Sequence, residues 1–109
     1  MERAYKKVDN CPYELAEVLS IFEHYFLRYE QVFRQVHPNI RLEQIKNIIE
    51  SMPYIENHGE SSAGDDITPG DYKKLIDKHF RTQYRNCNYN VNHFFSGDVR
   101  LLRYYEELY

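Results

Sequence analysis

The chain has 109 residues, of which 42% are hydrophobic, and its 17 acidic and 14 basic side chains give a net charge of −3. This length fits one domain, 1–109, with a single core that needs no disulfide or metal to hold it together. The net charge excludes a general polyanion binder of the histone type, and no apolar run approaches the roughly eighteen residues of a membrane-spanning helix.

Residues 1–10 are polar and mixed in charge, which predicts a flexible arm with Tyr5 and Val8 as possible docking points. Pro12, capped by Asn10 or Cys11, begins a predicted first helix over about 12–36. Its apolar residues recur at intervals of four and three, which predicts a long amphipathic helix on which the other helices pack. These residues, called here the helix 12–36 stripe, are Leu15, Leu19, Phe22, Phe26, Tyr29, Phe33 and Val36, and Val18, Tyr25 and Val32 widen the stripe. The repeat also permits a coiled-coil partner, so cover by the chain's own helices and self-association through this stripe both stay open.

Pro38 ends the first helix, because a proline disfavours helical geometry at the residue before it. A second amphipathic helix is predicted over about 40–52, ending before Pro53. Its apolar face consists of Leu42, Ile45, Ile48, Ile49 and Met52. The segment 56–68 is rich in glycine, serine and aspartate and has no apolar period, which predicts a mobile acidic loop.

Thr68 and Pro69 form a helix start signal, with threonine as the cap and proline at the first position of a third helix over about 69–84. Its predicted apolar face consists of Tyr72, Leu75, Ile76, His79, Phe80 and Tyr84. A last helix is predicted over about 97–108, capped by Ser96 or Asp98, and 91–95 is either a short helical turn or an extended piece.

These elements predict an all-α fold, a compact bundle of four main helices with the first as its spine. Residues from all four helices are expected to meet in one core. They are Phe22, Phe26, Ile45, Ile49, Ile76, Phe80, Leu102 and Tyr105.

The stretch from Tyr72 to Arg103 combines seven lysine and arginine residues with many aromatics, against only Asp77 and Asp98. Asparagines alternate through its centre, so two helices joined by an Asn-rich turn resemble a helix-turn-helix arrangement in outline. Cations neutralise phosphates, amides read bases and aromatic rings stack on them, so the stretch predicts a nucleic-acid or partner surface. Its candidate residues are Lys73, Lys74, Lys78, Arg81, Arg85, Asn88, Tyr89, Asn90, Arg100 and Arg103.

The sequence contains no comparable motif for a metal site or for catalysis. His79, Cys87 and His93 lack the closely spaced cysteine pair of zinc sites, so no metal or cofactor is predicted. Tyr104 and Tyr105 stand without an activating base or a metal-binding histidine pair, so we do not predict an enzyme.

The function predicted is a non-enzymatic protein-interaction or structural module, binding a protein partner or a second copy through the helix 12–36 stripe. The alternative is nucleic-acid binding by the segment 72–105. The two distant cysteines and the charged N-terminus predict a cytoplasmic protein without membrane contact.

Overall fold

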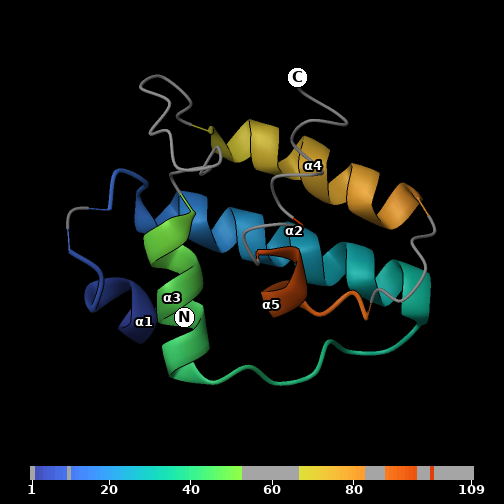
Figure 1. Cartoon of the computed structure of the whole chain (residues 1–109), viewed down its shortest axis with the longest axis horizontal. Helices are drawn as coiled ribbons and strands as arrows, with labels where there is room; N and C mark the ends of the chain where they lie inside the picture. Colours follow the sequence, from blue (N-terminus) through green and yellow to red (C-terminus); the bar gives the residue numbers. More distant parts are fainter. Residues whose placement is uncertain (1, 10, 53–66, 83–87, 96–98, 100–109) are drawn as a thin grey trace.

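A computed structural model of the chain describes residues 2–9, 11–52, 67–82, 88–95 and 99. The longest helix is α2 (Leu15–Phe33). Figure 1 shows α4 (Pro69–Arg81) running alongside α2 in the same direction. The helix α3 (Leu42–Ser51) crosses near the start of α2 with α1 (Glu2–Lys6) beside it, and the short α5 (Val91–Phe94) completes the set. Every element of the described residues is helical, so the all-α prediction is confirmed.

The bounds of α2 differ from the predicted 12–36 at both ends. The helix begins at Leu15, where the Glu14 N–H donates to the Glu17 carboxylate at 2.9 Å. The chain before it turns Tyr13 into the core, where its hydroxyl donates to the Ile67 carbonyl. Arg34 ends the helix in the left-handed conformation, with φ 57° and ψ 31°, and its N–H donates to the Glu30 carbonyl at 2.8 Å. The contact between Tyr13 and Ile67, which are 54 residues apart, therefore keeps the chain before Leu15 out of the helix.

The buried face of α2 is rotated from the centre of the predicted stripe toward Val18 and Tyr25, which were predicted to widen it, and includes Ile21, which was not predicted. Its buried residues are Val18, Ile21, Phe22, Tyr25 and Tyr29. Phe33 and Val36, which end the stripe, are 38% and 78% exposed. The rotation arises because α4 packs against one flank of α2, which draws Ile21 and Tyr25 inward.

Residues 2–9, predicted as a flexible arm with Tyr5 and Val8 as docking points, include α1. Ala4 is fully buried there, and the Tyr5 hydroxyl donates to the Tyr13 carbonyl at 2.6 Å. A Lys6–Glu2 ion pair of 3.4 Å adds a contact along the single turn. Ala4, Tyr5 and Val8 supply the apolar side that packs on the core, which is why this polar segment is ordered.

The start of α4 agrees with its prediction in detail. Thr68 Oγ1 accepts from the Asp71 N–H at 3.1 Å, and the Asp71 carboxylate accepts from the Thr68 N–H at 3.1 Å, with Pro69 at the first helical position. Its buried residues are Tyr72, Leu75, Ile76, His79 and Phe80. The helix ends at Arg81 because Thr82 is extended, and the predicted residues 83 and 84 lie outside the described part of the chain.

Most of the predicted core is found where it was expected. Phe22, Ile49, Ile76 and Phe80 are buried, and Phe26 and Ile45 are partly buried against them. The described residues do not include Leu102 and Tyr105, the predicted last helix apart from the helical Val99, or the acidic segment up to residue 66. Ile67 and Thr68, predicted as the end of that loop, are placed as a buried residue and a helix cap.

Candidate functional site

The connection between α2 and α3 turns one histidine into the protein. His37 is only 7% exposed, and its Nε2 accepts from the backbone N–H of Val91 at 3.0 Å. Its Nδ1 lies 2.8 Å from the Pro38 carbonyl oxygen. Because Nε2 must be unprotonated to accept, the proton is on Nδ1 and is donated to Pro38, so the imidazole is neutral. His37 thereby joins the α2–α3 connection to the first residue of α5.

Aromatic rings of α2 enclose this imidazole. The ring centroids of Tyr29, Phe26 and Tyr25 lie 4.7, 4.9 and 6.0 Å from that of His37. Burial among them lowers the pKa of His37 below its ordinary value, and the hydrogen bond to the Pro38 carbonyl opposes this more weakly. The sequence pattern predicts only that His37 lies near the end of the first helix, because its partner Val91 is 54 residues away.

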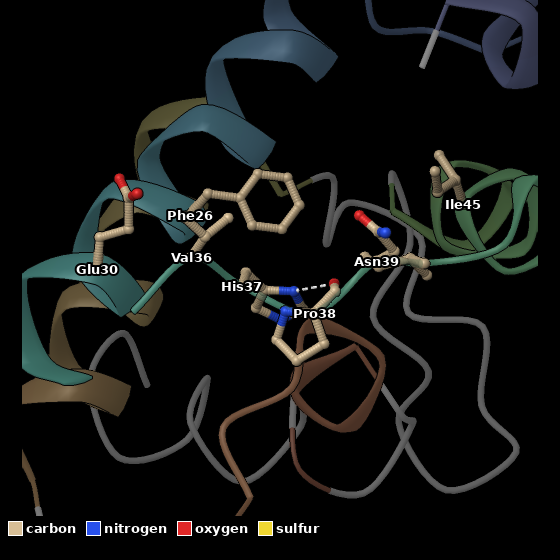
Figure 2. A pocket seen from close by; sticks show the side chains of 8 residues that line it. Phe26, Glu30, Val36, His37, Pro38, Asn39 and Ile45 are labelled. Carbon is tan, nitrogen blue, oxygen red and sulfur yellow. Dashed lines mark hydrogen bonds between the residues drawn. The ribbon is translucent and has the colours of Figure 1, made fainter. Parts of the chain in front are cut away.

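A groove of about 370 Å³ opens beside His37, between the end of α2, the connection and α3 (Figure 2). Its apolar lining consists of Phe26, Val36, Pro38, Ile40 and Ile45. Glu30, His37 and Asn39 add polar groups, and the Phe26 ring and Asn39 amide lie on opposite sides of the opening in Figure 2. Glu30 is the one acidic side chain in this lining. We call this site the α2–α3 groove.

A polar cluster joins α2 to α4 on the other flank of α2. His24 Nε2 lies 2.8 Å from Asp77 Oδ1, and Arg28 Nε lies 3.3 Å from the same oxygen. The buried Arg28 Nε makes no hydrogen bond, so this pair is a charge contact, while its Nη1 donates to Gln31 at 3.0 Å. Asp77, the carboxylate among the basic residues of α4, is therefore paired with side chains of α2.

The predicted basic surface is partly assembled by α4. Lys74 and Arg81 are exposed, Lys73 and Lys78 are half-buried, and all four lie on the side of α4 away from its buried face or on its flanks. Arg85, Arg100 and Arg103 lie outside the described residues.

The asparagine-rich turn has a local structural role. Asn88 Oδ1 accepts from the Asn90 N–H at 2.8 Å, and Asn90 Oδ1 accepts from the Asn92 N–H at 2.9 Å, which caps α5. The expectation that the Tyr89 ring meets bases is wrong, because this ring is buried against Phe33, His79 and Phe80. Its hydroxyl donates to the Thr82 carbonyl at 2.8 Å.

Within the described ranges, no group of three or more potential ligands is placed to hold a metal, and His79 is buried among aromatic rings. The helices in those ranges include none that is long and apolar enough to cross a membrane. Comparison with protein-family models, curated proteins and solved structures finds no significant match to this chain. The geometry of the α2–α3 groove and of α4 is therefore the basis for inferring a function.

Proposed function

We propose that this protein is an interaction module that binds a partner peptide in the α2–α3 groove. The main observation in support is that Val36, which is 78% exposed, lies at the rim of an opening lined by apolar side chains. Its volume of about 370 Å³ lies within the roughly 300–1,000 Å³ typical of ligand pockets. Burying the exposed Val36 and the half-buried Phe26 and Ile45 under a partner would supply an apolar driving force.

The charge at the groove favours a partner segment with a basic residue beside its apolar anchor. Glu30 is exposed and belongs to the lining, and the last turn of α2 contains no basic residue. The carbonyl end of a helix carries partial negative charge, which adds to that of Glu30. We therefore assign the groove to a peptide in which a large apolar side chain enters the opening and a lysine or arginine lies against Glu30.

A displayed random-peptide library tests this assignment with a defined probe. We expect selection on the wild-type protein to enrich sequences with a large apolar residue next to lysine or arginine. Val36→Asp should reduce the affinity of the selected peptides at least about tenfold, since a charge at the rim opposes apolar burial. Glu30→Lys should shift selection toward acidic neighbours.

Val32→Asp is the matched control, because Val32 is also exposed on α2, at 47%, but does not line the groove. It should leave the affinity of the selected peptides unchanged. Selection that yields no apolar and basic pairing, or peptides that bind Val36→Asp as well as wild type, would overturn the proposal.

A second candidate function is nucleic-acid binding through α4. It is supported by the exposed Lys74 and Arg81, with Lys78 between them, and by the pairing of Asp77 with His24 and Arg28. Each phosphate contact should contribute about −0.9 to the slope of log affinity for duplex against log salt concentration. The buried Tyr89 leaves backbone charge as the main contribution, so binding should depend little on sequence.

Fluorescence anisotropy with duplex and single-stranded oligonucleotides at low salt tests this second candidate. Lys74→Ala with Arg81→Ala should reduce the salt slope by up to about two units. Glu30→Gln, on the opposite flank of α2, should leave it unchanged. Wild-type protein that fails to bind near millimolar concentration would make these cations an ordinary solvated helix face.

A further inference from the structure

The backbone N–H groups at the start of α5 are each satisfied, and one of them depends on His37. The Asn92 N–H donates to Asn90 Oδ1, and the His93 and Phe94 N–H groups donate to the Asn90 carbonyl at 2.9 and 3.1 Å. The remaining one, the Val91 N–H, donates to His37 Nε2 at 3.0 Å. A helix start needs an acceptor for each of these donors, so a side chain from the α2–α3 connection completes α5.

We infer that His37 is a pH-sensitive switch whose protonation detaches α5 and weakens peptide binding in the α2–α3 groove. The part that concerns the peptide rests on the function proposed above. The part that concerns α5 stands on the hydrogen bond between His37 and Val91 and on the packing of His37.

Protonation converts the acceptor of this hydrogen bond into a donor. The Nε2–H of an imidazolium would face the Val91 N–H, so two donors would oppose each other at a fully buried residue. A charged ring among Tyr25, Phe26 and Tyr29 would also lose its hydration. Both effects drive the protonated ring out of its site, and the Val91 N–H then lacks its acceptor.

The groups around His37 decide where the charged ring moves. On the α2 side it packs against the rings of Tyr25 and Tyr29, and α2 also contributes Glu30 to the groove lining. From α5 it meets the Val91 backbone, and from α3 the lining contributes Ile45, neither of which is ionisable. Glu30 is the acidic residue of the groove lining, so the imidazolium moves into the groove toward it. There it competes with the basic residue of the peptide, and affinity decreases as the pH falls.

Loss of the His37 contact should act first on α5. This helix has four residues, and its Val91 and Phe94 are fully buried against the core. A helix this short is unstable without its tertiary contacts. Release of Val91 therefore exposes α5 while the longer α2 and α4 stay folded.

NMR on the isotope-labelled full chain tests the switch without any partner. The ring signals of each histidine are followed from pH 8 to pH 5 together with amide exchange. We expect the protection factor of the Val91 amide to fall about tenfold or more, with the same midpoint as His37 and not those of His79 or His93. The protection of Leu75 in α4 should stay constant over the same range.

His37→Gln is the diagnostic variant, because the glutamine oxygen can accept from Val91 but cannot be protonated in this range. It should remove the pH dependence of Val91 protection, whereas His24→Gln should retain it. Val91 protection that stays constant while His37 titrates, or pH dependence that persists in His37→Gln, would overturn the switch.

The two proposals fail in different experiments. Peptides selected on wild type are titrated at pH 7.5 and pH 5.5, and we expect at least about tenfold weaker binding at the lower pH. No peptide binding at either pH refutes the proposed function while the NMR result for α5 stands. If the peptides bind equally well at both pH values while Val91 is released at low pH, only the proposed control of the groove by His37 is refuted.

Discussion

Arg34 shows how one residue can hold a helix end in a conformation that its side chain disfavours. With φ 57°, it adopts the left-handed region, which costs a residue with a Cβ roughly 1–2 kcal/mol and glycine very little. Glycine removes this cost but raises the entropy of the unfolded chain, which offsets part of the gain, so we expect Arg34→Gly to stabilise the protein by about 0.5–1 kcal/mol. Urea unfolding measures this change. Gln31→Gly, inside the last turn of α2, should instead lose about 1 kcal/mol. A destabilised Arg34→Gly would contradict the argument.

Phe80 and Phe26 were expected to be equal members of the core, and their burial separates them. Phe80 is buried beside Tyr25, with ring centroids 4.9 Å apart, whereas Phe26 is partly exposed in the groove. Phe80→Ala should therefore destabilise the protein by about 3–5 kcal/mol. Phe26→Ala should cost roughly half as much, because less apolar area leaves contact with the core. Equal changes in unfolding free energy would show that the groove is closed in solution.

At the level of elements, the cap of α4 is the clearest local determinant. Thr68 and Asp71 each accept a hydrogen bond from the backbone of the other. Thr68→Ala should lower the unfolding free energy by about 1 kcal/mol, and Thr68→Ser should largely preserve it. Thermal unfolding distinguishes the two. If both variants melted alike, tertiary contacts of Ile67 and Tyr72 would be holding the helix start.

Elements could be predicted from the sequence where, as at this cap, their determinants are neighbouring residues. The start and buried face of α4 depend on neighbouring residues, so pattern and capping rules identify them. The start of α2 depends on Tyr13 reaching Ile67, and the α2–α3 connection depends on His37 reaching Val91; each contact joins residues 54 positions apart, which no local pattern encodes. For the site, periodicity identified Phe26, Val36 and Ile45 as apolar but could not show that they meet at an opening.

For the molecule as a whole, the buried neutral His37 couples stability to pH. Its pKa in the folded protein lies below the usual value of about 6.5, so the unfolded chain binds a proton first as the pH falls. The stability that the neutral form contributes is complete above about pH 6.5 and is lost as the pH falls through the folded-state pKa. We expect the melting temperature of wild type to decrease over this window relative to that of His37→Gln. Parallel melting curves against pH would contradict this coupling.

Two tyrosine hydroxyls donate hydrogen bonds to the backbone on either side of segment 53–66. Tyr72 donates to the Met52 carbonyl at the end of α3, and Tyr13 donates to the Ile67 carbonyl just before α4. Both ends of the segment are thus attached to the core independently of what joins them. Doubling the length of such a connection costs only about 0.6 kcal/mol in closure entropy. The protein should therefore accept a foreign insertion there, or new chain termini in a circular permutant, with α2 and α4 still packed together.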